Sequence, residues 1–230
     1  MRKDPAEREA LRLVAESADR AYARMLERPF AGRTEREIGA ELAGLLRDEG
    51  HDEVGFTIVA SGPNGASPHH ETGDRRVVEG DIVVLDFGGS IEGYRSDITR
   101  TVHVGRTIER EAQRVHDAVR RAQEAGYAAA REGASAESVD AASRAVIEQA
   151  GYGPQFIHRT GHGIGLDGHE HPYLVRGNRE RLEPGMAFSI EPGIYLEGRF
   201  GVRIEDIVVI DDDGSVRGLN RADHAFAIVG

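Results

Sequence analysis

The sequence of 230 residues contains no cysteine, which excludes disulfide bonds, thiolate nucleophiles and cysteine-ligated metal sites. It also contains no apolar run that approaches the ~18 residues of a membrane span. The first residues, MRKDPAEREALRLV, are charged and lack an apolar core, so they do not read as a secretory signal. We therefore expect a cytoplasmic protein that makes no use of a membrane.

The chain contains fewer basic than acidic residues. The chain has 29 Lys and Arg against 40 Asp and Glu, which gives a formal net charge of -11. Nucleic-acid binding depends on neutralising phosphates, so this balance argues against a nucleic-acid partner. A hydrophobic content of 39% and a charged content of 30% fit a globular protein. A chain of this length predicts a single domain over 1–230.

The chain repeats one order of elements, two helices followed by two strands. In the first half, Asp4 and Thr34 are predicted to cap helices, because each precedes by three residues a glutamate that can complete a capping box. In the second half, Thr107 and Ser135 are predicted to cap the corresponding helices. Apolar residues then recur at helical spacing after each of these four positions.

Each pair of helices precedes two apolar strands that carry acids. In the first half, the strand Ile82–Leu85 is predicted to end on Asp86, and a second strand is predicted to contain Asp97. In the second half, the strand Met186–Ile190 is predicted to lead to Glu191, and its partner strand to contain Glu205. The matched order predicts an α+β fold of two related halves, about 1–106 and 107–230, packed face to face.

Pseudo-symmetry would bring the acids Asp86, Asp97, Glu191 and Glu205 to one point. Acids are depleted in strands and are rarely buried unless they are paired or bind metal. Converging anions repel strongly, so a positive group is expected between them. Arginine could supply that charge, but one or two divalent metal ions fit better. Carboxylates joined by an imidazole favour Mn, Co or Fe, with Zn as an alternative.

The stretch GHGIGLDGHEHP, residues 161–172, allows two interpretations. Its glycines match the GxGxxG pattern of a dinucleotide loop, but no following helix is expected because Pro172 interrupts the segment. Alternatively, the glycines on either side of His162 let the backbone bring this side chain close to the acids. His158 lies four residues earlier, yet Gly161 and Gly163 argue against one helix that presents both histidines. We therefore interpret the stretch as the source of the imidazole.

The motifs LDFGG, YRSDITRT, HRTGHGIGLDGHEHP, SIEPGIY and GVRIEDIVVI together resemble the pita-bread metallopeptidases, the creatinase/aminopeptidase fold. That family includes methionine aminopeptidase, prolidase and Xaa-Pro aminopeptidase. The resemblance implies two divalent metal ions, with Mn favoured and Co, Fe and Zn as alternatives. Asp86 would hold one ion, His162 and Glu191 the other, and Asp97 and Glu205 both.

The resemblance also implies roles for residues around the metals. Glu191 would take the proton of the nucleophile and pass it toward the leaving nitrogen. His169 would hydrogen-bond the substrate, and His69 would border the specificity pocket, so both join Glu191 as implied catalytic residues. His158 and Arg203 match substrate-binding positions of the proline-specific branch. A further group, His51, His70 and His171, is expected to consist of ordinary surface or loop histidines.

The segments SGPNGASPHHE and GVRIED resemble the proline-specific members. The function implied is therefore hydrolysis of the bond between an N-terminal residue and a following proline, by an Xaa-Pro aminopeptidase or dipeptidase. The alternatives are removal of N-terminal methionine, a non-catalytic peptide-binding module, and metal-free hydrolysis as in the creatinase relatives. The N-terminal domain of two-domain relatives is expected to be absent, which leaves a homodimer open.

Overall fold

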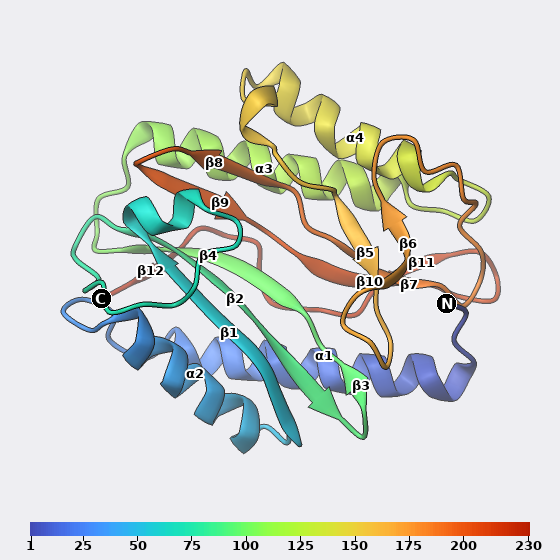
Figure 1. Ribbon diagram of the computed structural model, residues 1–230, viewed down its shortest axis with the longest axis horizontal. Coiled ribbons are helices and arrows are strands. Elements are labelled where there is room, and N and C mark those ends of the chain that lie inside the picture. The colour runs from blue at the N-terminus through green and yellow to red at the C-terminus, as the bar shows by residue number, and fades with distance from the viewer.

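Four helices enclose the strands of the protein. The computed structural model describes all 230 residues. Helices α1 and α2 lie along one side of the strands, and α3 and α4 lie along the opposite side (Figure 1). No helix combines the length and the apolar character that a membrane crossing requires. The helices are α1 Pro5–Met25, α2 Glu35–Asp48, α3 Arg110–Ala129 and α4 Ala136–Gln149.

Two of the four predicted helix caps are confirmed in full. Asp4 and Thr34 each close a capping box with the glutamate three residues later. Ser135 takes the N-cap position of α4, but its side chain makes no capping bond. The prediction for Thr107 is wrong, because α3 begins at Arg110. The intervening residues are not helical, and among them Ile108 packs against the core.

The first sheet has the order β1-β2-β4-β12, with β3 paired to the end of β2. All of its pairs are antiparallel except β12 with β4, which is parallel. The last strand of the chain therefore lies in the sheet that the first half builds. The strands are β1 Glu53–Ser61, β2 Ile82–Ile91, β3 Tyr94–Arg95, β4 Ile98–Val104 and β12 Ala227–Val229.

The second sheet has the order β11-β10-β7-β5-β6, and β8 and β9 form a separate hairpin. These elements confirm the predicted α+β class with two αα-ββ halves. Two short 3-10 helices, η1 Gly62–Ala66 and η2 Gly153–Gln155, complete the structure. The strands are β5 Gly161–Gly163, β6 Glu170–Leu174, β7 Ala187–Ile190, β8 Gly193–Leu196, β9 Phe200–Arg203, β10 Asp206–Ile210 and β11 Val216–Gly218.

Three strand predictions need correction. Asp97 was expected inside a strand, but it lies just before β4, which begins at Ile98. Asp86 does not end a strand but lies inside the ten-residue β2, because β1 and β4 pair with both edges of β2 at that residue. The single strand expected around Glu205 is divided into β9 and β10. It is divided because β9 pairs with β8, whereas β10 pairs with β7. At the break, the Glu205 N–H donates to the Thr99 carbonyl at 3.1 Å, which joins the two sheets.

The apolar core is divided between the two halves. An 18-residue cluster packs α1 and α2 on the first sheet, and includes the fully buried Met25, Leu42 and Leu85. Smaller clusters fill the space between α3, α4 and the second sheet, for example around Val139 and Phe188. A further cluster packs Leu11 and Ala15 of α1 on the second sheet, so α1 contacts both sheets. The polar residues between the two sheets are left to form a site.

Candidate metal centre

The five predicted metal ligands come from five different places in the chain. Asp86 lies in β2, Asp97 just before β4, His162 in β5, Glu191 just after β7, and Glu205 between β9 and β10. All five line one cavity of about 570 Å³. The same cavity is lined by the four predicted substrate-binding residues, His69, His158, His169 and Arg203.

The ligand atoms of these residues lie close together in overlapping groups. His162 Nε2 is 3.3 Å from Glu191 Oε1 and 3.7 Å from Asp97 Oδ2. In one group, ligand atoms of His162, Glu191 and Glu205 all lie within 4.8 Å of one another. In a second group, carboxylate oxygens of Asp86, Asp97 and Glu205 meet the same limit. The cluster is therefore shared between the halves, with two acids from the first and three ligands from the second.

The carboxylates of the cluster are buried and crowd one another. Burial, followed by repulsion from neighbouring carboxylates, raises the pKa of Asp97 and of Glu205 well above the usual range. Burial also raises the pKa of Glu191 to about 7, although Arg203 opposes this shift. These shifts mean that the protein alone does not supply enough positive charge to favour the ionised forms of Asp97 and Glu205.

Three features of the cluster fit a bound divalent metal ion. Two carboxylate oxygens, Asp86 Oδ1 and Glu205 Oε1, are buried without any hydrogen-bond partner. Such orphaned acceptors are rare in proteins and mark a place for a cation. Burial lowers the pKa of His162 to about 3, so its imidazole is neutral. Its Nδ1 faces the Gly163 carbonyl at 3.1 Å, which leaves the Nε2 lone pair directed at the acids.

Two hydroxyl groups that were not predicted from the sequence hydrogen-bond three of the predicted ligands. Thr99 Oγ1 donates to Glu205 Oε2 at 2.7 Å and accepts from Arg203 Nε at 3.1 Å. Ser189 Oγ accepts from the His162 N–H at 3.0 Å and donates to Glu191 Oε1 at 3.1 Å. The available signal was a hydroxyl residue two positions from a predicted ligand, and for Ser189 it lies on an otherwise apolar strand.

Arg203 is the principal cation of the cluster and is only 4% exposed. Its Nη2 donates to Asp86, and its Nη1 donates to the Tyr195 hydroxyl at 2.8 Å. The Tyr195 oxygen also lies 2.8 Å from His158 Nε2. Burial, then the charge of Arg203, lowers the pKa of His158 to about 3. Tyr195 was missed in the sequence, although a buried tyrosine hydroxyl four residues after Glu191 requires a polar partner.

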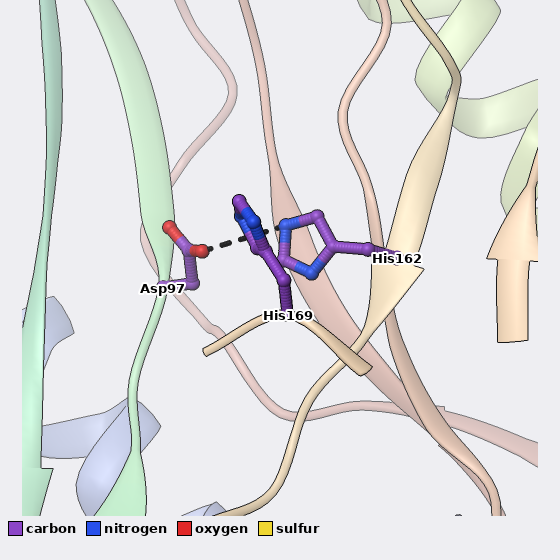
Figure 2. A group of neighbouring side chains, drawn as sticks. All are labelled: Asp97, His162 and His169. Atoms are coloured by element: carbon purple, nitrogen blue, oxygen red, sulfur yellow. Dashed lines mark ion pairs between the residues drawn. The ribbon is translucent and has the colours of Figure 1, made fainter. Parts of the chain in front are cut away.

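His169 lies directly beside the predicted ligands. Its ring packs on that of His162 with the centroids 3.9 Å apart, and Asp97 faces His162 from the first sheet (Figure 2). His169 also belongs to a group of ligand atoms with Asp97 and His162. It is exposed toward the cavity, whereas His162 is 2% exposed.

The wall of the cavity holds one cation without an acidic partner. The Arg159 guanidinium lies 4.8 Å from the centroid of the Tyr173 ring and forms no ion pair. Its charge lowers the pKa of His169, second to the effect of burial. Arg159 was not predicted from the sequence, where it is one of 29 basic residues.

His51, His70 and His171 were expected to be ordinary surface or loop histidines, but two of them form specific contacts with polar side chains. His51 is 4% exposed, and its Nε2 lies 2.9 Å from the hydroxyl of Ser96, which precedes Asp97. His70 Nε2 lies 2.9 Å from the buried carboxylate of Glu35. Both predictions failed because a distant segment supplies the partner. His171 is exposed as expected, with 63% of its side chain accessible.

Comparisons with known proteins agree on one family. Residues 8–212 match the profile of metallopeptidase family M24. The chain is 50% identical over 230 residues to the probable dipeptidase PepE of Mycobacterium tuberculosis, covering 100% of this chain and 61% of that protein. It is 39% identical over 216 residues to the Xaa-Pro dipeptidase of Pyrococcus furiosus, covering 94% and 62%.

Solved structures give the same result. The dipeptidase PepE from Mycobacterium ulcerans superposes with a TM-score of 0.97 at 47% identity, covering 100% of this chain and 62% of that one. The X-Pro aminopeptidase from Thermotoga maritima gives a TM-score of 0.96 at 40% identity, covering 100% and 65%. The chain thus spans less than two thirds of the length of these relatives.

Proposed function

The chain belongs to metallopeptidase family M24, and from this membership we propose that it is a metal-dependent Xaa-Pro peptidase. The reaction would be hydrolysis of the bond between an N-terminal residue and a following proline. The observation that carries the proposal is the convergence of the five predicted ligands on one cavity, where two buried carboxylate oxygens have no hydrogen-bond partner. Both halves contribute predicted ligands, so they would act together as one catalytic domain over 1–230.

We propose that the cluster holds two divalent ions, with Mn favoured by a set of carboxylates and one imidazole. Asp86 would hold one ion, His162 and Glu191 the other, and Asp97 and Glu205 both. When bound, the ions supply Lewis acidity that polarises the peptide carbonyl and makes water a nucleophile at neutral pH.

The chain's own residues then position the substrate and move the proton. Glu191 lies on the cavity wall, and Ser189 orients its Oε1. This carboxylate can accept a proton and deliver it to the departing nitrogen. His69 and His169 are exposed to the same cavity and can hydrogen-bond the peptide. Arg203 balances the charge of Asp86 and keeps that side chain fixed.

Arg159 supports a dipeptide as the preferred substrate. A dipeptide carries a free carboxylate on its proline, close to the bond that is cut. Arg159 is a cavity cation without an acidic partner, so it is free to form an ion pair with that carboxylate. Two relatives have names that point the same way, the probable dipeptidase PepE of Mycobacterium tuberculosis and the Xaa-Pro dipeptidase of Pyrococcus furiosus.

A small substrate panel tests the proposal. Ala-Pro, Ala-Pro-Ala and Met-Ala-Ala are each incubated with the metal-free protein after addition of Mn, Co or Zn. We expect rapid release of alanine from Ala-Pro, slower release from Ala-Pro-Ala and none of methionine. Release of methionine with both proline peptides intact would instead identify a methionine aminopeptidase. A protein that binds none of the three metals would be a peptide-binding module.

The role of Arg159 has its own test. The variant Arg159→Met should raise KM for Ala-Pro by roughly tenfold, because a charge-assisted hydrogen bond contributes about 1.5–3 kcal/mol. Ala-Pro amide lacks the carboxylate, so its KM should be the same for both proteins. An equal loss on the acid and the amide would contradict this role.

A further inference from the structure

A second buried carboxylate lies outside the metal cluster, at the start of α2. Glu35 is the first residue of this helix and its side chain is fully buried. Helix N-termini favour negative charge, but a buried carboxylate also needs hydrogen bonds. Burial alone would raise the pKa of Glu35, yet the hydrogen bonds from Ser61 and His70 outweigh this effect and hold the pKa below its usual value.

Five donor groups surround this carboxylate. Ser61 donates from both its N–H and its hydroxyl, at 2.8 and 2.7 Å. Asn64 Nδ2 lies at 3.0 Å, His70 Nε2 at 2.9 Å and the Gly73 N–H at 3.2 Å. Because an ionised carboxylate only accepts hydrogen bonds, His70 must carry its proton on Nε2. One side chain of α2 therefore ties together the end of β1, η1 and the irregular segment that follows.

That irregular segment, 67–73, forms part of the cavity wall. It contains Pro68 and His69, which line the cavity with the metal ligands. The segment has no helix or strand of its own, and the His69 side chain is exposed. Its other link to the sheet is Thr72, whose hydroxyl accepts from the Val59 N–H at 2.9 Å and donates to the Thr57 carbonyl at 3.0 Å.

His69 and His70 are neighbours with opposite environments. His69 is exposed and lines the cavity, whereas only 18% of the His70 side chain is accessible and its ring bonds Glu35. Fixing His70 against α2 therefore also fixes the backbone from which His69 reaches the cavity. Without this bond, the segment would gain several free backbone torsions, and His69 would no longer be held in one orientation.

We propose that Glu35 and His70 form a positioning pair that holds segment 67–73 against β1 and so presents His69 to the bound peptide. The inference rests on the proposed function only for the nature of the substrate. Neither residue touches the metal ligands or the cavity, and their effect on the reaction passes through His69. The pair makes His70, a residue with an ordinary loop position in the sequence, a determinant of activity.

The test changes His70, because removal of Glu35 would leave all five donors without this acceptor. The variants His69→Ala, His70→Ala and the double variant are compared on Ala-Pro in the metal-loaded protein. Each single variant should lower kcat/KM by roughly tenfold, in the range of residues that orient an active group. The double variant should lose no more than the worse single variant, because both changes remove one function. Losses that multiply would overturn the proposal.

A second readout does not depend on activity. Hydrogen–deuterium exchange of backbone amides in 67–73 should accelerate roughly tenfold in His70→Ala, with no change in α3 and α4. His70→Gln can still donate an amide N–H to Glu35, so it should restore both slow exchange and activity. Unchanged exchange in His70→Ala, or unchanged kcat/KM despite faster exchange, would overturn the proposal.

The chain offers a matched control in the same place. Arg36 and Asp74 form an exposed ion pair that joins α2 to the residue just after the segment, with Nε and Oδ1 2.8 Å apart. Exposed pairs contribute little, so Arg36→Ala should leave exchange and activity within twofold. If the wild-type protein does not cleave Ala-Pro, the proposed function fails. The exchange experiment then still decides whether the pair anchors the segment.

Discussion

Each half of the chain has a buried carboxylate that anchors a wall of the cavity. In the first half this residue is Glu35, at the start of α2. In the second half it is Asp140, one turn inside α4. Asp140 accepts from the Thr160 hydroxyl at 2.8 Å and pairs with Arg144. Arg144 in turn donates to the carbonyls of Phe156 and His158. Both carboxylates therefore connect a helix to a segment that carries a cavity histidine.

The backbone around the two helices is nevertheless the same. The spacing that relates Gly32 to Gly133 places Ala136 opposite Glu35 and Gly39 opposite Asp140. Equivalent backbone hydrogen bonds recur in both halves. The Gly32 N–H donates to the Val77 carbonyl and the Gly133 N–H to the Leu182 carbonyl, both at 2.8 Å. The Glu35 N–H donates to the Arg75 carbonyl at 3.0 Å and the Ala136 N–H to the Glu180 carbonyl at 2.9 Å. The two halves therefore share these backbone bonds, but the anchoring carboxylate lies at a different position on each helix.

The largest effect should come from removing one ligand in each half. Asp97→Asn and His162→Ala should each lower kcat/KM by about a thousandfold, because both halves are needed to hold the metals. Metal content by mass spectrometry and the melting temperature would be measured together. Asp97→Asn should also raise the melting temperature of the metal-free protein, since a crowded buried acid is removed. An active His162→Ala protein would show that the ligand assignment is wrong.

The Asp140 carboxylate, which anchors the cavity wall in the second half, should contribute several kcal/mol to the free energy of unfolding. Asp140→Ala should lower the free energy of unfolding by about 3 kcal/mol, because it leaves a largely buried Arg144 without its carboxylate. Urea denaturation measures this change. Glu124→Ala is the control, since it removes an exposed pair with Arg120 at the same i,i+4 spacing and should cost under about 0.5 kcal/mol. Equal losses in the two variants would indicate that Asp140 is not an anchor.

The metal cluster itself should destabilise the metal-free protein as the pH rises. Burial raises the pKa of Glu191 from 4.5 to about 7, so its folded-state pKa exceeds the unfolded value. The stability that this protonated group contributes is complete below about pH 4.5 and is lost as the pH rises through about 7. The free energy of unfolding of wild type minus that of Glu191→Gln should therefore fall across this window. A difference that is constant with pH would refute the assignment.

The smallest effect should be the same in both halves. Gly32 and Gly133 have φ of +84° and +76°, and a Cβ at either position would meet nothing within 4 Å. Gly32→Ala and Gly133→Ala should each cost about 1 kcal/mol, from backbone strain alone. Thermal unfolding would compare the two variants with wild type. Costs that differ by more than about 1 kcal/mol would show that the two turns are not equivalent.

The features that the sequence predicted are those set by local pattern or by charge. The capping boxes at Asp4 and Thr34 depend on residues three apart, and both form. The ligand cluster was predicted because acids on apolar strands require a partner wherever the strands meet. The resemblance to known motifs then supplied the identity of each ligand position.

The features that the sequence missed depend on distant partners. Strand β1 was not predicted from the sequence, and the residues of its N-terminal half are exposed or half-buried in the structure. His51 and His70 looked ordinary, since Ser96 and Glu35 become their neighbours only after folding. Tyr195 was missed for the same reason, as its hydroxyl is bonded by residues from other elements. No local pattern in a sequence records such pairings.

The parallel pairing of β12 with β4 affects the order in which the protein can be made. The Gly230 carbonyl accepts from the Phe30 N–H, and the Val229 carbonyl accepts from the Gly105 N–H. The C-terminal residues therefore contact both the segment between α1 and α2 and the end of β4. During synthesis, residues 1–106 emerge long before 227–230, and the edge of β4 is unpaired until then. The half that carries Asp86 and Asp97 therefore cannot complete its sheet on the ribosome ahead of the half that carries His162.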